Sequence, residues 1–262
     1  MKRYFGQNLI LILIFVSVLT GASLRTVAQQ ENWKTKNVDQ WTEADIDIVL
    51  NKSDWVATQE VRLLFDSNAT KLSGSGDTPQ EIENNRITHG ATDTPVDFEF
   101  KLRLRSALPI RLALVRQSQI KANYDALSKE ERAALDAKLK GLYVCPACTD
   151  NYVLTLSSRS KNFPGADAVF STLKGAKLED LKRYVYLMSS SGGKRELVHF
   201  IPPKAPGDEA TFFFRRLDER GKPLFTPADK TLIFRLSDKD NSVTTNFVLD
   251  ISKIVVGGQV IF

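Results

Sequence analysis

The stretch FEFKLRLR, residues 98–105, alternates apolar and charged side chains without exception. Because successive side chains of a β-strand point to opposite faces, this alternation predicts a half-buried strand with a cationic outer face. Further extended pieces are expected on either side of it, at Val61–Phe65 and at Tyr152–Leu156.

Four segments before residue 190 carry helical signals. They lie at about 42–53, 106–124, 128–142 and 178–188. Thr42 is a candidate N-cap, and acids follow it in the first turn, where the helix dipole favours them. Ser128 and Glu131 match a capping box, in which side chains and backbone at a helix start bond reciprocally. These signals predict helices with defined first residues.

The chain after residue 195 is β in character. Extended stretches are expected at 196–201, 211–217, 231–236, 244–251 and 254–261. The stretch 211–217 is expected to pair across Asp218–Gly221 with the next extended piece. The sequence therefore predicts an α+β protein, with helices mainly in the first two-thirds and an antiparallel β-sheet in the C-terminal third. Residues 29–65 would supply an N-terminal helix and strand, and residues 96–262 the remainder of a single domain.

Residues 66–95 are polar and rich in Gly, Ser, Thr and Asn, and their few apolar residues show no period. A structureless loop of about thirty residues is uncommon in a compact domain. Two interpretations stay open: a functional polar loop, or a disordered excursion whose composition supports no core. Either interpretation predicts a mobile segment.

The N-terminus has the three parts of a secretory signal peptide. Lys2 and Arg3 give a positive start, residues 9–19 are apolar, and small and polar residues lead to Ala28. The apolar run has roughly half the ~20 residues that a membrane-spanning helix needs. We expect cleavage after Ala28, with Ala22 as the other candidate position and an uncleaved anchor as the alternative. Residues 1–28 are thus assigned as a signal peptide, and the mature protein is expected to be periplasmic or extracellular.

The charge of the chain belongs largely to this N-terminal segment. The whole sequence has a formal net charge of +5, but residues 1–28 contain three cations and no acid, so +2 remains after cleavage. Nucleic-acid binders carry a strong basic patch or stripe, and a nearly neutral chain offers none. The composition therefore argues against a nucleic-acid partner, and no later run is apolar enough to span a membrane.

Cys145 and Cys148 are the two cysteines of the chain, in the order Cys-Pro-Ala-Cys. Because an exported protein meets an oxidising compartment, a structural disulfide in a turn between a helix and a strand is the favoured interpretation. Closing so short a loop contributes roughly 2 kcal/mol in the entropic model. An exchangeable redox pair is the alternative, but the residues after Cys148 predict a helix breaker rather than the helix that such a pair uses.

No other group of residues predicts catalysis, cofactor binding or metal binding. A zinc site would need two further ligands, and His89 and His199 lie far from the cysteines in the sequence. The catalytic, cofactor-binding and metal-binding sets are therefore expected to be empty.

Two segments resemble the hallmarks of an uncharacterised family of secreted bacterial proteins. Trp41-Thr42, followed by Ser53-Asp54-Trp55, is similar to the opening of these proteins, which usually have Pro at the position of Asp54. Ser106–Ala113, with the sequence SALPIRLA, resembles their second hallmark, a strand that runs into a helix. The resemblance implies a signal peptide and a stand-alone exported domain, and it carries no known activity.

These patterns favour an exported, non-enzymatic protein with a structural, envelope-associated or binding role. Its partner would be a protein or another component of the envelope. An extracytoplasmic thiol–disulfide protein that uses Cys145 and Cys148 is the competing hypothesis.

Overall fold

The computed structural model describes residues 32–66, 93–226, 228–237, 244–253, 255–256 and 259–260. Its helices are η1 Asn32–Thr35, η2 Val38–Gln40, α2 Glu43–Asn51, α4 Leu108–Lys121, η3 Tyr124–Ala126, α5 Lys129–Val144, α6 Ala147–Asp150, α7 Ala168–Leu173, α8 Leu178–Leu181 and η4 Ile251–Lys253. Its strands are β1 Val56–Asp66, β2 Asp93–Leu104, β3 Asn151–Ser160, β4 Val185–Ser189, β5 Lys194–Ile201, β6 Ala210–Arg215, β7 Thr231–Ser237, β8 Thr244–Asp250, β9 Val255–Val256 and β10 Gln259–Val260. Within these ranges no helix combines the length and the apolar character that crossing a membrane requires.

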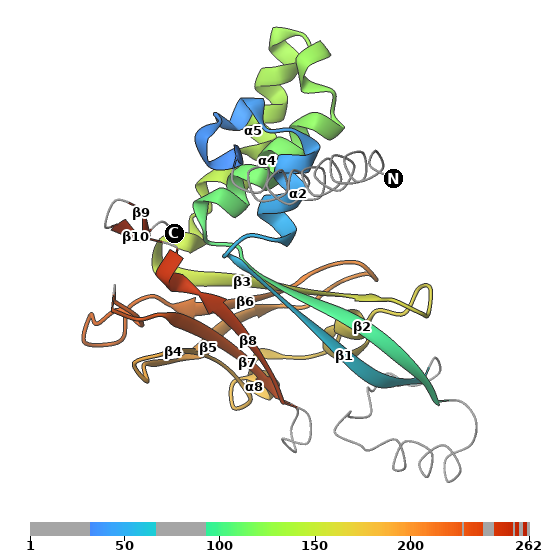
Figure 1. The fold of residues 1–262 in the computed structure, drawn as a ribbon, viewed down its shortest axis with the longest axis vertical. Helices are drawn as coiled ribbons and strands as arrows, with labels where there is room; N and C mark the ends of the chain where they lie inside the picture. Colours follow the sequence, from blue (N-terminus) through green and yellow to red (C-terminus); the bar gives the residue numbers. More distant parts are fainter. Residues whose placement is uncertain are drawn as a thin grey trace, which may run out of the picture.

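One antiparallel sheet of eight strands organises the molecule, in the order β1-β2-β3-β6-β5-β4-β7-β8 (Figure 1). The sheet curls until its two edge strands, β1 and β8, contact each other. Phe212 on β6 and Phe234 on β7 demonstrate the curl, because their ring centroids lie 5.1 Å apart although β5 and β4 separate the two strands. Both side chains are fully buried, so the concave face of the sheet holds the core.

This sheet shows that the expected division of the fold was wrong. Strands β1, β2 and β3, all within the first two-thirds of the chain, belong to the same sheet as the C-terminal strands. The joining contact is β3 against β6, with Leu154 opposite Phe212. Both strands carry apolar side chains on the concave face, and this long-range pairing buries them together.

Two local predictions in the second half of the chain were also wrong. The helix expected at 178–188 ends after one turn as α8, and Val185–Ser189 forms β4. Val185, Leu187 and Ser189 are buried in alternation, which is a period of two residues rather than a helical period. The hairpin expected across Asp218–Gly221 is reduced to one bridge between Leu217 and Pro223, since β6 pairs with β3 and β5.

Local signals were more reliable where a cap or an alternating run defined the element. Thr42 is the N-cap of α2 and forms a capping box with Asp45, and Ser128 forms the expected box with Glu131 at the start of α5. The strand expected at 98–105 is the second half of β2. Its outer cations contact helix α2: Arg103 Nε donates to Leu50 O at 2.7 Å. Cations near a helix C-terminus bind the carbonyl groups that have no partner within the helix. The cationic face of β2 therefore makes structural contacts with α2.

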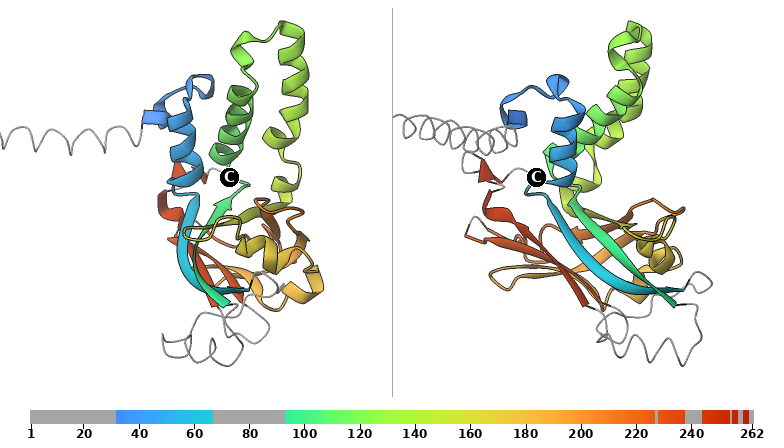
Figure 2. Two further views of the ribbon diagram at one scale, coloured as in Figure 1. Left: turned by 90° about the vertical axis from the view of Figure 1, so that its right-hand side faces the viewer. Right: turned by 45° about the vertical axis from the view of Figure 1, so that its right-hand side comes forward.

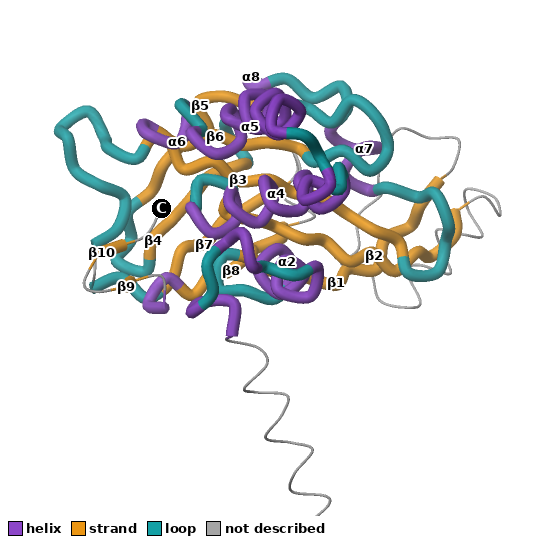
Figure 3. Tube along the Cα trace, turned by 90° about the horizontal axis from the view of Figure 1, so that it is seen from above, coloured by secondary structure: helices purple, strands orange, loops and turns teal. Residues whose placement is uncertain are grey.

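The larger helices stand at one end of the sheet (Figure 2). Seen from above, α4 lies between α2 and α5 (Figure 3). The three tryptophans of the chain form a cluster, in which the Trp33 ring is 5.6 Å from that of Trp41 and 5.8 Å from that of Trp55. In contrast, α5 buries a single residue, Leu139, and the α4–α5 hairpin projects away from the sheet. The sheet end that carries α5 is where the two cysteines lie.

Some predictions fall on residues that the structure does not describe. The signal peptide of residues 1–28 lies outside the described residues, as does most of the polar segment 66–95. The ends of that segment, Asp66 and Asp93–Pro95, belong to strands β1 and β2.

Candidate functional site

The cysteines form a disulfide in the short connection between α5 and β3. We call Cys145–Cys148 the disulfide turn. Cys145 ends α5 in a left-handed conformation, with φ of 44°, and Cys148 N donates to Cys145 O at 2.8 Å. The two Cα atoms are 5.3 Å apart, which is an ordinary separation for a disulfide. The expected bond is thus present, between the expected helix and strand.

A one-turn helix follows the first cysteine, and it ends at the residues that were expected to break a helix after Cys148. Helix α6 spans Ala147–Asp150, and Pro146 precedes it with helical backbone angles. Proline favours the start of a helix because its φ is already helical. Asn151 closes the turn, since its side-chain amide donates to Ala147 O at 3.0 Å. The polar residues that suggested a breaker therefore end a short helix.

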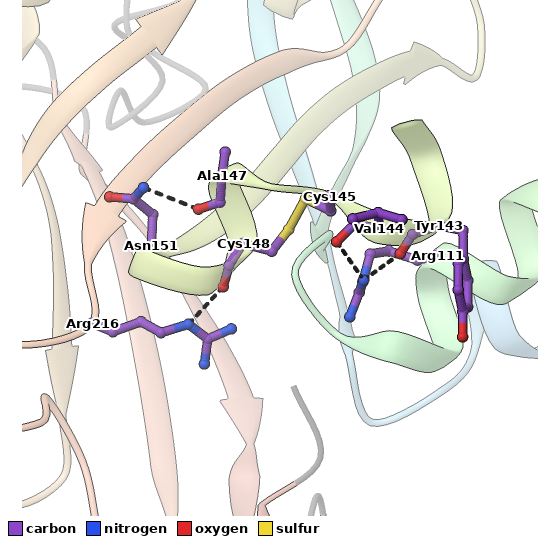
Figure 4. Close-up of a disulfide and its surroundings, with 8 residues drawn as sticks. All are labelled: Arg111, Tyr143, Val144, Cys145, Ala147, Cys148, Asn151 and Arg216. Carbon is purple, nitrogen blue, oxygen red and sulfur yellow. Dashed lines mark hydrogen bonds between the residues drawn. A yellow bond between two sulfur atoms is a disulfide. The ribbon is translucent and has the colours of Figure 1, made fainter. Parts of the chain in front are cut away.

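Two arginines hold the disulfide turn from either side (Figure 4). Arg111, from the first turn of α4, donates through Nη1 to Tyr143 O and, at 3.3 Å, to Val144 O. Arg216, just beyond β6, donates through Nε to Cys148 O at 2.8 Å. These carbonyls end α5 and α6, where helices leave acceptors without intrahelical partners. The turn is therefore fixed by the disulfide and by hydrogen bonds to two other elements.

Burial shifts the pKa values of the side chains next to the disulfide turn. Burial lowers the pKa of Arg111 and of Arg216, because a desolvated guanidinium holds its proton less tightly. The Arg216 guanidinium lies 5.0 Å from the Tyr152 ring centroid, and burial raises the pKa of Tyr152 to about 12. The phenol thus stays neutral at physiological pH, next to a cation.

The two cysteines differ in exposure. Cys148 is buried and Cys145 keeps part of its surface exposed. Three exposed apolar side chains flank the turn, and we call them the apolar rim: Tyr143 (49% exposed), Val144 (47%) and Leu217 (53%). Tyr143 and Val144 directly precede Cys145, and Leu217 follows the arginine that binds Cys148 O. The rim therefore consists of two exposed side chains that lead into the disulfide turn and one that follows the arginine bound to it.

Two other hollows of the described surface are lined by side chains that form no comparable arrangement. A groove of about 280 Å³ between α2 and α4 is lined by the apolar Ile46, Leu50 and Ile120 and by polar side chains that include both acids and Lys121. A more open depression between α8 and β5 is lined mainly by charged side chains of both signs. Among the described residues no three His, Cys, Asp or Glu side chains are grouped so as to hold a metal ion. His199 packs its ring 4.9 Å from the ring of Phe213, whereas His89 lies outside the described residues.

Sequence reasoning found Cys145 and Cys148 but missed Arg111 and Arg216. One signal pointed to Arg111: a cation in the first turn of a helix is unfavourable next to the positive end of the dipole. Such a cation needs a compensating contact from another element, and the α5 carbonyls provide it. For Arg216 no comparable signal exists, because its role depends on the β3–β6 pairing. Comparison with protein families, with curated proteins and with solved structures finds no match to this chain.

Proposed function

We propose that this chain is an exported, non-enzymatic binding protein that contacts a protein partner of the cell envelope through the disulfide turn and the apolar rim. Export is inferred from the sequence of residues 1–28 and is in keeping with the resemblance to secreted proteins. The observation that supports the contact surface is the exposure of Tyr143, Val144 and Leu217 around one fixed turn.

A turn that is already fixed lowers the free-energy cost of association. Ordering a flexible loop at an interface costs free energy, and a turn that is already fixed avoids that cost. Here the disulfide, Arg111 and Arg216 fix the backbone before any partner arrives. Aromatic side chains such as Tyr143 dominate the energetics of many interfaces because they bury a large area with few rotatable bonds. A rigid turn with an exposed tyrosine therefore has the physical character of an interface centre.

The test replaces one rim residue and one matched residue elsewhere. Leu217→Asp places a charge in the rim, and Val248→Asp places the same charge on β8, at a side chain that is also 53% exposed. Tagged mature protein is recovered from the envelope, and the proteins that co-purify with it are quantified by mass spectrometry. Because interface centres contribute at least about 2 kcal/mol each, we expect Leu217→Asp to lower the recovery of one specific protein at least tenfold.

The control variant, Val248→Asp, should leave the recovery of that protein unchanged. If both variants retain the same proteins in the same amounts, the rim is not the contact surface. Circular dichroism of both variants checks that the fold is intact.

A second candidate function, thiol–disulfide exchange, is favoured by the asymmetry of the cysteines. An exposed first cysteine can be attacked while a buried second cysteine resolves the mixed disulfide. Nearby arginines and a following helix lower a thiol pKa, and the turn has Arg111, Arg216 and the single turn of α6.

The reduction potential distinguishes the two candidates. A bond that only fixes the turn should have a potential below about −300 mV, whereas exchange proteins lie between about −120 and −270 mV. Equilibration with glutathione gives the potential, and alkylation rates against pH give the thiol pKa of Cys145. A readily reduced bond with a thiol pKa below about 7.5 would move thiol–disulfide exchange to first place.

A further inference from the structure

Two half-buried arginines flank the first turn of α4 without a negatively charged partner. Among the described residues, neither Arg105 nor Arg111 forms an ion pair with a carboxylate, and the Arg105 side chain makes no hydrogen bond. The Nε of Arg111 is buried and also lacks a hydrogen-bond partner within those residues. Buried cations in proteins are normally paired, because an unpaired one is costly to remove from water.

The charged residues around Arg105 and Arg111 increase the local excess of positive charge. Burial lowers the pKa of Arg105; Glu209 opposes that shift, and the positive charges of Arg103 and Arg111 add to it. Glu209 is already engaged, since it accepts a hydrogen bond from Arg103 Nη1. Arg111 in turn lowers the pKa of Arg216. The region between the end of β2 and the disulfide turn therefore has more positive than negative charge.

The helix itself adds to the positive potential. Helix α4 has 14 residues, its N-cap Ala107 provides no side-chain hydrogen bond, and its first turn contains no acid. The adjoining Ser106 is fully buried, and its hydroxyl has no hydrogen-bond partner among the described residues. An uncapped helix start carries a partial positive charge, although Pro109 at the second position of α4 has no N–H to donate. The guanidinium groups of Arg105 and Arg111, which repel each other, thus lie close in sequence to a helix start that is also positive.

We propose that Arg105, Arg111 and the first turn of α4 bind an oxyanion, either a carboxylate or a phosphate group. A guanidinium presents parallel N–H groups that match two oxygens of such a group, and the helix start adds a partial positive charge. Both arginines retain some exposed surface, so a small anion can reach them from solvent. Arg111 also donates to the carbonyls of Tyr143 and Val144, so the site adjoins the proposed protein contact, although that contact uses apolar side chains.

The experiment uses inorganic phosphate and acetate as probes on the mature, oxidised protein. Phosphate binding is followed by ³¹P line broadening and acetate binding by ¹H saturation transfer, both at constant ionic strength in chloride. We expect saturable binding that Arg105→Gln weakens at least tenfold, because a charge-assisted hydrogen bond is worth about 1.5–3 kcal/mol. Saturation by phosphate alone identifies a phosphate-type site, and saturation by acetate as well identifies a carboxylate-accepting site.

Two further variants separate binding from folding. Arg132→Gln is the control, because Arg132 is half-buried like both arginines and, like Arg111, donates to backbone carbonyls, those of Tyr124 and Asp125, at the far end of α5. It should leave the affinity within twofold, and Arg105→Lys should restore part of it. Arg105→Gln should fold with unchanged or higher stability in chloride, since it removes an unpaired cation. The proposal is overturned if neither anion saturates, or if Arg105→Gln binds as wild type, or if Arg132→Gln weakens binding equally.

Discussion

A double-mutant cycle on Phe212 and Phe234 tests the curl of the sheet. The two residues lie on β6 and β7, and strands β5 and β4 separate them in the sheet. Neighbouring strands are about 4.8 Å apart, so in a flat sheet the two backbones would be about 14 Å apart. The observed centroid separation of 5.1 Å, at an interplanar angle of 61°, is an edge-to-face contact across the concave side.

The structure sets the expected magnitudes. Both side chains are fully buried, and Phe234 also has the rings of Phe214 and Phe247 at 6.1 Å. Truncation of a buried Phe to Ala costs about 3–5 kcal/mol, so milder Leu replacements are used in both positions to keep the protein folded. An aromatic pair in this geometry contributes about 0.5–1.5 kcal/mol beyond its buried area. We therefore expect a coupling free energy of about 1 kcal/mol between Phe212→Leu and Phe234→Leu.

The assay is urea unfolding of the wild type, the two single variants and the double variant, followed by circular dichroism at fixed disulfide state. Val248→Leu, on the convex face of β8, combined with Phe212→Leu provides a pair expected to be additive within about 0.3 kcal/mol. Additivity of the Phe212 and Phe234 variants to the same degree would refute the curled arrangement.

Two other predictions concern pH. Because burial raises the pKa of Tyr152 to about 12, its contribution to stability is complete below pH 10 and is lost as the pH rises through 12. The unfolding free energy of the wild type should fall between pH 10 and 12, and Tyr152→Phe should make that fall about 2 kcal/mol smaller. Urea titrations at each pH measure the unfolding free energy, and an unchanged slope would contradict this prediction. Burial alone would raise the pKa of Asp229, but hydrogen bonds from Thr226 N, Ser191 N and neighbouring hydroxyls hold it well below its usual range. Its contribution is therefore present above pH 4 and is lost on further acidification, and Asp229→Asn should flatten the stability profile below pH 4 relative to wild type.

Much of the local structure could be predicted because short-range interactions define it. Thr42 and Ser128 cap helices through bonds to residues three positions away, and such signals are contained within the sequence of one turn. The alternation of residues 98–105 likewise fixes the two faces of β2. Cys145 and Cys148 are close enough in sequence for their pairing to be predicted once an oxidising compartment is expected.

The arrangement of the sheet could not be predicted in this way. Segment 178–188 contains apolar residues that suit either a helix or a strand, and pairing of Val185–Ser189 with β7 and β5 decides between them. The β3–β6 pairing joins residues about sixty positions apart and depends on the closure of the whole core. The contacts of Arg111 and Arg216 near the disulfide turn follow from that packing, so the unfavourable position of Arg111 in the first turn of α4 was the one sign of them in the sequence.

The central claim is that the apolar rim contacts a protein partner, and site-specific photo-crosslinking tests it most directly. A photoreactive phenylalanine analogue replaces Tyr143 in one protein and Val248 in another, and both are exported by living cells before irradiation. The account predicts one discrete crosslinked species from position 143 and none in common with position 248. Identical patterns from the two positions, or no crosslink from position 143, would contradict it.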